Sequence, residues 1–150
     1  MKKTMLSVKH LLGFFLLGFS ANTASANDVS LFDFKGRPTA YIAKDKTIYL
    51  WDGKPVAYLD GDDPKAGLNI YGFNGKHLGW FKGGILYDND GMMLGGIQQV
   101  FKTPTQPEPL KDLKDLKPLK NLKDLKPLKP LFSKEWADLT LKLFLKQGSE

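Results

Sequence analysis

The sequence predicts an all-β fold in which four β-hairpin pseudo-repeats surround a pseudo-fourfold axis. A low-complexity Leu-Lys-Pro tail and a short C-terminal helix follow. The main observation is a twelve-residue pattern that occurs four times between Leu31 and Ile97, with a glycine between two apolar segments in every copy. Repeats this short cannot bury their apolar faces alone, so the four copies must share one core.

The first 26 residues have the organisation of a secretory signal peptide. Lys2 and Lys3 precede an apolar run over residues 11–19, and the small residues Ala-Ser-Ala end at Ala26. The run is shorter than the roughly 20 residues that span a bilayer, so we favour cleavage after Ala26 over a retained membrane anchor. We therefore expect an exported protein, periplasmic or extracellular, with no transmembrane span in the mature chain.

Charge and cysteine content narrow the choice of partners. The chain has 22 basic residues, 16 acidic residues and no Cys. Removing the three lysines of the signal peptide leaves 19 basic residues and a net charge of +3. This charge is nearly balanced, which disfavours nucleic acid as a partner. Without disulfides, an exported protein depends on its core for stability.

These patterns divide the chain into four regions. They are a signal peptide (1–26), a four-hairpin β repeat domain (27–101), a Leu-Lys-Pro low-complexity linker (102–132) and a C-terminal amphipathic segment (133–150).

Each repeat has the pattern of a β-hairpin with a glycine at its tip. The tip glycines are Gly36, Gly53, Gly75 and Gly91. Three of them follow Asp or Asn, which is typical of two-residue type I′ turns, and we predict that turn type. The residue five places before each glycine then pairs with the residue four places after it. The predicted pairs are Leu31 with Ala40, Ile48 with Ala57, Ile70 with Gly79, and Leu86 with Gly95.

A large aliphatic residue opposite a small one, four times over, predicts hairpins that converge on a crowded axis. The small residues Ala40, Ala57, Gly79 and Gly95 are the expected lining of that axis. The opposite face of the hairpins is aromatic, and its candidate ligand-binding residues are Tyr49, Trp51, Tyr71, Phe73 and Trp80. We expect these rings to pack between neighbouring repeats. The alternative is an aromatic surface that faces solvent or a ligand.

Several strings of the sequence resemble the bacterial 4-fold β flower protein family. They are IYLWDGKPVAYLDGD, IYGFNGKHLGWF and YDNDG, and the Lys-Pro-Leu tail that ends in a Trp-containing segment is similar too. The resemblance implies four hairpin repeats around a pseudo-fourfold axis. Members of the family are exported bacterial proteins of unassigned activity, so the resemblance implies no catalytic residues.

The tail has a period of three, with a leucine at every third position from Leu110 to Leu131 and a lysine after each leucine up to Leu128. On an α-helix these leucines would wrap around the whole cylinder, and Pro118, Pro127 and Pro130 would interrupt it. A polyproline II helix keeps one leucine edge and one lysine edge in line. Short helical turns between residues 110 and 117 are the alternative.

We expect this tail to be a semi-rigid spacer. The alternative is a docking edge, with its leucines on the domain or on a partner. Its lysines would then face anionic envelope polymers or lipid headgroups.

The last residues predict an amphipathic helix. Ser133 is a suitable N-cap, the helix would run to about Lys146, and Trp136 would begin an apolar stripe with Leu139 and Leu143. Alternating leucines over 139–145 leave a strand open. We expect Trp136 to anchor the segment to the hairpins. The alternative is a partner-binding helix that exposes Leu141, Phe144 and Leu145.

Side chains suited to catalysis are scarce. His77 is the only His after the signal peptide, and its position at a turn suggests a solvated loop residue rather than a general base. Ser30, Ser133 and Ser149 lack the context of a nucleophile. Residues 60–63 and 88–91 are rich in Asp but lack calcium-loop spacing. We predict no catalytic residues, no metal and no cofactor.

The sequence thus predicts a non-enzymatic, exported cell-envelope module that interacts with an unknown envelope partner or polymer. Its oligomeric state is open. The alternative is a carbohydrate or cell-wall binding module in which aromatic residues of adjacent hairpins form shallow sites. A small hydrolase is the third hypothesis.

Overall fold

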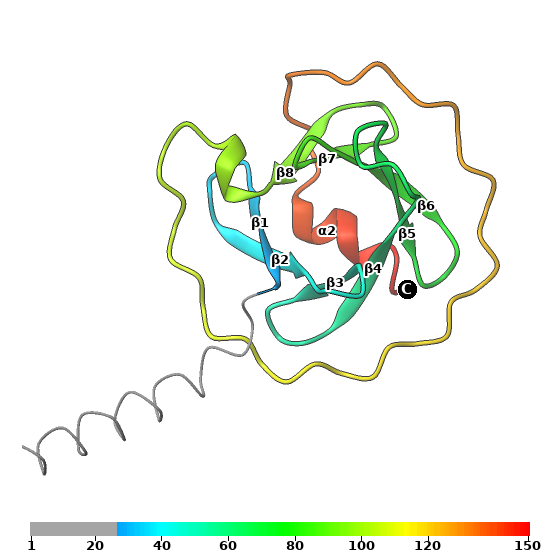
Figure 1. Cartoon of the computed structure of the whole chain (residues 1–150), viewed down its shortest axis with the longest axis horizontal. Coiled ribbons are helices and arrows are strands. Elements are labelled where there is room, and N and C mark those ends of the chain that lie inside the picture. Colours follow the sequence, from blue (N-terminus) through cyan, green and yellow to red (C-terminus); the bar gives the residue numbers. More distant parts are fainter. Residues whose placement is uncertain (1–26) are drawn as a thin grey trace, which may run out of the picture.

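The computed structural model describes residues 27–150, and the predicted signal peptide lies outside them. Eight antiparallel strands close into a barrel in chain order (Figure 1). The strands are β1 (Val29–Asp33), β2 (Pro38–Ile42), β3 (Thr47–Leu50), β4 (Pro55–Asp60), β5 (Leu68–Gly72), β6 (His77–Lys82), β7 (Ile85–Asp88) and β8 (Met93–Gly96). Consecutive pairs form the four predicted hairpins, so the all-β fold class is confirmed.

The predicted register across the hairpins is confirmed in all four copies. Leu31 pairs with Ala40, Ile48 with Ala57, Ile70 with Gly79, and Leu86 with Gly95. The six of these residues that are not glycine are fully buried, and all six belong to one hydrophobic core. The barrel closes where β8 pairs with β1.

The small residues are needed because two other parts of the chain approach them. A Cβ atom on Gly79 would overlap the carbonyl oxygen of Tyr87 in the adjacent strand and would lie 3.0 Å from the ring of Phe144. A Cβ atom on Gly95 would overlap the carbonyl of Phe32 and would lie 2.8 Å from Leu141. Glycine at these two positions therefore leaves room for the neighbouring strand and for the C-terminal helix.

The turns differ from the predicted type I′. That type requires positive φ at the residue before the glycine, and Lys46 is the sole non-glycine residue with positive φ among residues 27–150. Instead the Gly36 N–H donates to the Asp33 carbonyl at 2.9 Å, and the four tip glycines have φ of 72° to 89°. Each tip is a three-residue loop with glycine in the left-handed conformation at its last position.

A second irregularity restores the predicted register beyond each tip. In the second hairpin, Tyr49 pairs with Pro55 and Ile48 with Ala57, so Val56 is an extra residue in its strand. Leu78 and Leu94 are the equivalent extra residues of the third and fourth hairpins. All three are buried in the core. In the last three hairpins the bulges therefore add apolar side chains to the barrel interior, whereas the extra residue of the first hairpin is the partly buried Thr39.

The helix α2 (Leu141–Lys146) lies inside the barrel (Figure 1). Its Leu141, Phe144 and Leu145 are buried in the same core as the hairpin aliphatic residues. These are the residues that a partner-binding helix would expose, whereas Leu139 and Leu143 of the predicted apolar stripe are 37 % and 55 % exposed. The predicted stripe is therefore wrong, and the helix binds its own barrel.

The helix also begins later than predicted. Thr140, rather than Ser133, is the N-cap, and its side chain accepts a hydrogen bond from the Leu143 N–H. The preceding segment is not helical because it bonds to β8. The Met93 N–H donates to the Glu135 carbonyl, and the Ala137 N–H donates to Met93. Backbone groups that bond to a strand are not free to form a helix.

Trp136 anchors this segment to the barrel, as predicted. It forms an isolated parallel bridge with Met93, and its ring lies 6.3 Å from the rings of both Phe101 and Phe34. Phe101 follows the short 3-10 helix η1 (Gln98–Val100). In residues 27–150, neither η1 nor α2 has the length and hydropathy of a membrane-spanning helix.

The Leu-Lys-Pro segment encircles the outside of the barrel (Figure 1). We call residues 102–133 the belt. It contains no helix or strand, and its chain connects η1 on the outside of the barrel to α2 at the centre. The belt is therefore not a spacer that leads away from the domain.

Candidate functional site

The belt is bound to the hairpin tips through hydrogen bonds that repeat every nine residues. The N–H groups of Gln106, Asp115, Asp124 and Ser133 donate to the carbonyl groups of Gly36, Gly53, Gly75 and Gly91, respectively, at 2.8–2.9 Å. Successive donors are nine residues apart, and successive acceptors belong to successive hairpins. Two further bonds, from Asp112 to Trp51 and from Asn121 to Phe73, have the same spacing. The belt thus carries one nonapeptide for each hairpin.

The tip glycines have a second role under the belt. A Cβ atom on Gly53, Gly75 or Gly91 would overlap the carbonyl oxygen of a belt leucine. These leucines are Leu113, Leu122 and Leu131, which are also nine residues apart. Glycine therefore both adopts the left-handed turn conformation and lets the belt backbone reach the turn.

The positions of the belt prolines follow from this bonding. Asp112, Asp115, Asn121 and Asp124 donate N–H groups to the barrel. Pro118 and Pro127 follow each pair of donors, where the belt crosses from one hairpin to the next. Proline lacks an N–H, so it fits the crossings. Pro130, nine residues after Asn121, stands in the donor register, so the fourth nonapeptide lacks the bond that Asn121 makes in the third. The sequence signal for this nine-residue repeat is the hexapeptide Leu-Lys-Asp-Leu-Lys-Pro, which occurs at residues 113–118 and again at 122–127. The prediction from the period of three missed this longer repeat.

Belt lysines cover the aromatic face of the barrel. One series places an ammonium group over a ring in three successive hairpins: Lys111 over Tyr41 at 4.5 Å, Lys120 over Tyr58 at 4.0 Å and Lys129 over Trp80 at 5.2 Å from the ring centroid. The next series is Lys114 over Tyr49 at 5.2 Å and Lys123 over Tyr71 at 5.4 Å. In the fourth nonapeptide Phe132 takes this position, with 4.4 Å between its ring centroid and that of Tyr87. Cation–π attraction therefore holds the belt on the rings.

Carboxylates between the hairpins pair with the same row of lysines. Lys111 contacts Asp28 at 3.1 Å, Lys123 contacts Asp60 at 3.0 Å, and Lys117 contacts Asp45. Burial alone would raise the pKa of Asp45, but the hydrogen bonds from Lys117 and Thr47 outweigh it and lower that pKa to about 2. The barrel thus positions these lysines, while the side chains of Lys117 and Lys123 still keep nearly half of their surface exposed.

The predicted ligand-binding aromatic residues lie beneath the belt. Tyr49, Tyr71, Phe73 and Trp80 are at most 4 % exposed, and Trp51 is partly buried. Rings of adjacent strands pack together: Tyr41 lies 5.6 Å from Tyr49, and Tyr58 lies 6.1 Å from Tyr71. Burial, followed by the charge of Asp28, raises the pKa of Tyr41 to about 12, so this ring stays neutral. Packing between repeats is therefore observed, and the aromatic face is not an open platform.

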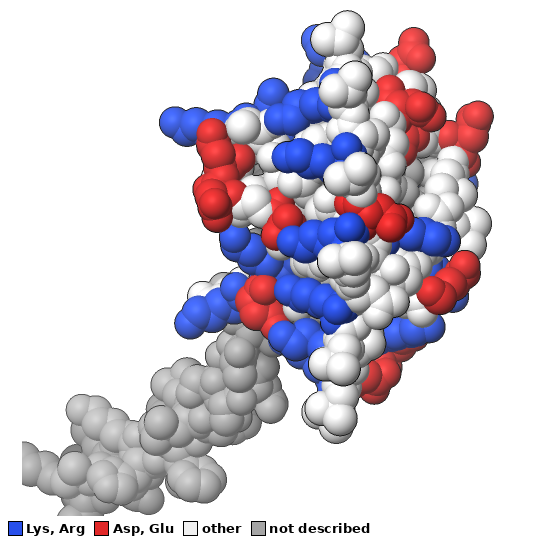
Figure 2. All heavy atoms as spheres, turned by 90° about the vertical axis from the view of Figure 1, so that its right-hand side faces the viewer, with Lys and Arg blue, Asp and Glu red and all other residues white. Residues whose placement is uncertain are grey.

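The outer edge of the belt is a row of exposed leucines. Leu110, Leu113, Leu116, Leu119, Leu122, Leu125, Leu128 and Leu131 are 93–98 % exposed. Figure 2 shows uncharged side chains that project from the surface beside lysines that lie flat against it. Eight large apolar side chains on one continuous edge exceed what folding of a monomer requires, and such patches mark interaction sites.

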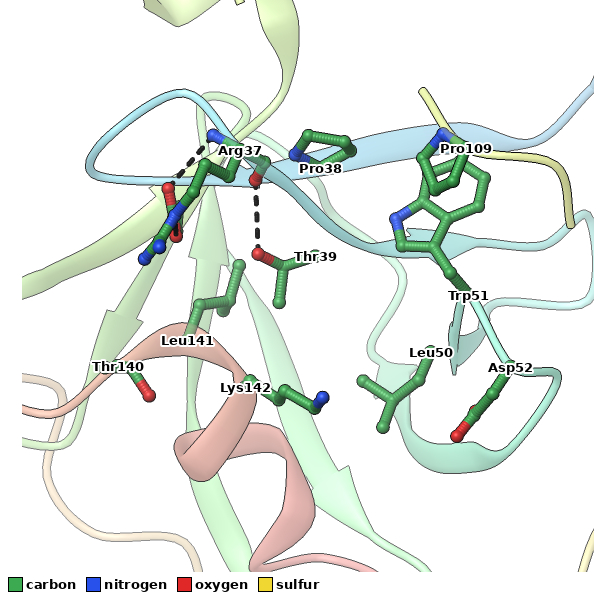
Figure 3. Close-up of a pocket in the computed structure, with 11 residues that line it drawn as sticks. Arg37, Pro38, Thr39, Leu50, Trp51, Asp52, Pro109, Thr140, Leu141 and Lys142 are labelled. Atoms are coloured by element: carbon green, nitrogen blue, oxygen red, sulfur yellow. Dashed lines mark hydrogen bonds and ion pairs between the residues drawn. The ribbon is translucent and has the colours of Figure 1, made fainter. Parts of the chain in front are cut away.

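A cleft of about 490 Å³ lies between the first two hairpins and the start of α2 (Figure 3). Trp51 and the belt residue Pro109 provide apolar wall, and Lys142 of α2 provides a cation. On another side, the Arg37 Nε donates to the Asp33 carboxylate at 2.8 Å. A second cleft of about 530 Å³ contains Trp80. The two tryptophans of the predicted aromatic site thus each line a cleft, although they do not share one.

His77 is buried, contrary to the expectation of a solvated loop residue. Its Nδ1 lies 2.9 Å from the side-chain oxygen of Asn89, and its Nε2 lies 3.0 Å from that of Asn69. Asn89 stands where the other hairpins carry an aromatic residue, and it provides the carboxamide that allows burial. Burial and then the charge of Lys126 lower the pKa of His77, against the opposing effect of Asn89. Within residues 27–150, no three His, Cys, Asp or Glu side chains are grouped to hold a metal ion.

Comparison with known proteins agrees with this architecture. A family model described as 4-fold beta flower protein matches residues 29–145, which include the barrel, the belt and most of α2. No curated protein and no solved structure matches significantly. The family model covers more than half of the chain, and the closed all-β barrel is consistent with its description. The chain therefore belongs to the 4-fold β flower protein family.

Proposed function

We propose that the protein is a non-enzymatic module of the cell envelope, exported with cleavage after Ala26, that docks on an envelope component through its belt leucines. The observation that carries this proposal is the exposure of all eight leucines at 93–98 %. Burial of one leucine side chain contributes about 1.5–3 kcal/mol. The belt backbone is already fixed on the barrel, so docking orders little additional chain.

The leucines are not needed to hold the belt. Backbone N–H groups, lysine ammonium groups and Phe132 make the contacts with the barrel. A polar residue at each outward position would leave those contacts intact. The recurrence of leucine at every outward position therefore supports a role outside the barrel.

Cell fractionation tests the proposal. The precursor would be expressed in a bacterial host as wild type and as a triple variant, Leu119→Asn, Leu122→Asn and Leu125→Asn. We expect wild type in the envelope fraction and the triple variant in the soluble exported fraction, with unchanged thermal unfolding. Leu143→Asn is the matched control, because Leu143 is an exposed leucine outside the belt. Retention of the precursor in the cytoplasm, or equal distribution of wild type and triple variant, would overturn the proposal.

A carbohydrate or cell-wall binding function is the second candidate, and the cleft of Figure 3 favours it. Sugar sites combine an aromatic wall with charged hydrogen-bonding groups. Trp51, Asp33, Arg37 and Asp52 provide both around one cleft. The carbohydrate would then occupy the cleft, and not the aromatic face under the belt.

Retention on purified peptidoglycan tests this second candidate. We expect Trp51→Ala to lose at least about tenfold in retention. Because Trp51 also packs 5.3 Å from Tyr41, Asp52→Asn is the second variant, and it should lower retention without a change in unfolding temperature. Unchanged retention in Asp52→Asn and Trp51→Ala would remove the candidate.

A further inference from the structure

We propose that residues 116–131 of the belt dock on an anionic lipid surface, with their leucines inserted into the headgroup boundary. This inference rests on the proposed function of the belt as a docking surface, and it names the chemistry of the partner. It concerns one half of the belt, because the two halves differ in charge.

The charge of the second half complements an anionic surface. Residues 116–131 contain six leucines, five lysines and one aspartate, which gives a local net charge of +4. Residues 110–115 contain two leucines, two lysines and two aspartates, so their net charge is zero. Basic residues at a membrane surface are attracted by anionic lipids. The leucine edge is therefore accompanied by a net positive charge in residues 116–131 and by no net charge in residues 110–115.

The lysines of this half remain accessible although the barrel positions them. The side chains of Lys117 and Lys123 are 46 % and 43 % exposed while they contact Asp45 and Asp60. Lys120 and Lys129 lie over aromatic rings. Figure 2 looks onto the side of the molecule where the belt is coloured yellow to orange in Figure 1, and lysines lie there beside projecting uncharged side chains. Lysine ammonium groups and leucine side chains are thus exposed on the same face of the molecule.

The spacing of the leucines fits a lipid surface better than a protein groove. Leucines three residues apart on an extended threefold chain are separated by about 9 Å. Each gap contains a lysine followed by proline, asparagine or aspartate, so the leucine tips project separately along the edge. A curved belt also presents few of them at once to a flat protein, whereas a standard interface needs about 800 Å² on each partner. A lipid surface deforms around separate projections and has no fixed shape to match.

Vesicle binding by residues 27–150, the part that folds as one barrel, tests the inference. The vesicles would contain either phosphatidylcholine alone or equal amounts of phosphatidylcholine and phosphatidylglycerol. We expect sedimentation with the anionic vesicles to be at least about tenfold stronger and to weaken as salt is added. The triple variant Leu119→Ser, Leu122→Ser and Leu125→Ser should lose at least about tenfold in binding at unchanged unfolding temperature.

A site-specific probe identifies the half of the belt that inserts. The chain has no cysteine, so Leu122→Cys and Leu113→Cys can each carry one polarity-sensitive fluorophore. We expect a blue shift with anionic vesicles at position 122 and none at position 113, which is the matched control in the neutral half. Equal shifts at both positions, no shift at either, or equal binding by wild type and triple serine variant would overturn the inference.

A failure of this inference is distinguishable from a failure of the proposed function. Leucine-dependent self-association without vesicle binding, measured by analytical ultracentrifugation, would reject the lipid surface in favour of a second copy of the chain. In that case cell fractionation would still depend on the leucines, and the proposed docking function would be retained. If fractionation shows no dependence on the leucines, the docking function itself is rejected.

Discussion

The ammonium group of Lys120, in the belt, lies 4.0 Å from the ring centroid of Tyr58, in β4. The Tyr58 ring is buried, and within residues 27–150 its hydroxyl group has no hydrogen-bond partner. Lys120 therefore interacts with the face of the Tyr58 ring and not with its hydroxyl group. It shows how the barrel and the belt form one unit: the hairpins supply rings, and belt lysines supply cations that cover them.

Replacement of Lys120 by Met tests the energetic role of that charge. Met keeps an unbranched side chain but removes the cation, so we expect the free energy of unfolding to fall by about 1 kcal/mol in urea titrations. Lys126→Met is the matched control, since within residues 27–150 Lys126 is not among the belt lysines that lie over a ring. It should stay within about 0.5 kcal/mol of wild type. Equal losses in the two variants would show that the charge over the ring is not what stabilises the belt.

The pattern of donors and prolines predicts opposite effects for two exchanges in the belt. Asn121→Pro removes the N–H that donates to the Phe73 carbonyl at 2.9 Å, and we expect a loss of about 1–3 kcal/mol in unfolding free energy. Pro118→Asn restores an N–H where the belt crosses between hairpins, and it should change stability by less than about 0.5 kcal/mol. Hydrogen exchange gives a second measurement: the Asn121 and Asp124 amides should be protected in wild type. Rapid exchange of both amides would contradict the bonding described here.

Gly79 and Ala57 occupy equivalent positions in adjacent hairpins, and they should respond differently to one methyl group. Gly79→Ala places a Cβ atom against the Tyr87 carbonyl, which is backbone and cannot move aside, so we expect a loss of about 3 kcal/mol or failure to fold. Ala57→Gly removes a buried methyl group and should cost about 1 kcal/mol. Urea titration of both proteins makes the comparison. A fully stable Gly79→Ala variant would mean that the axis is less crowded than the structure shows.

The buried His77 predicts a loss of stability in mildly acidic solution. Burial lowers its pKa below the ordinary value of 6.5, so the folded state favours the neutral ring. In the unfolded chain the ring takes up a proton near pH 6.5, so stability is complete above that pH and falls as the pH drops below it. The urea midpoint should therefore decrease between about pH 7 and pH 5.

The control for this pH dependence is His77→Gln, which has a carboxamide and does not titrate. Its urea midpoint should be flat over the same pH range. Asp45 does not interfere, because its pKa is lowered from 3.8 to about 2 and its contribution is lost only at lower pH. A slope in His77→Gln equal to that of wild type would assign the effect to other groups.

The barrel could be predicted from the sequence because its rules are local and repeated. The position of Leu31 relative to Gly36 fixes its pairing with Ala40, and the same spacing recurs three more times. The turn type was wrong because Asp-Gly and Asn-Gly occur both in type I′ turns and in three-residue loops with a glycine bulge. The choice between them depends on whether an extra residue such as Val56 can enter the core, which is a property of the closed barrel.

For the belt, the sequence predicted the period of three but not which edge faces the barrel. The leucine and lysine edges follow from the spacing of the residues, but the edge that faces the barrel depends on distant groups. Apolar burial alone would favour the leucines inside. The barrel surface instead offers rings such as Tyr58 and carboxylates such as Asp45, which select ammonium groups. For α2, the pairing of the preceding segment with Met93 decides where the helix begins, and that strand is about 40 residues away in the sequence.

The one-to-one match between nonapeptides and hairpins links two lengths that would otherwise vary independently. Hydrogen-bond donors advance by nine residues each time the acceptor glycine advances by one hairpin. An evolutionary duplication that added a fifth hairpin would leave the encircling segment nine residues short, and α2 could no longer reach the centre. The number of hairpins in such a protein can therefore change only together with the length of the segment that surrounds them.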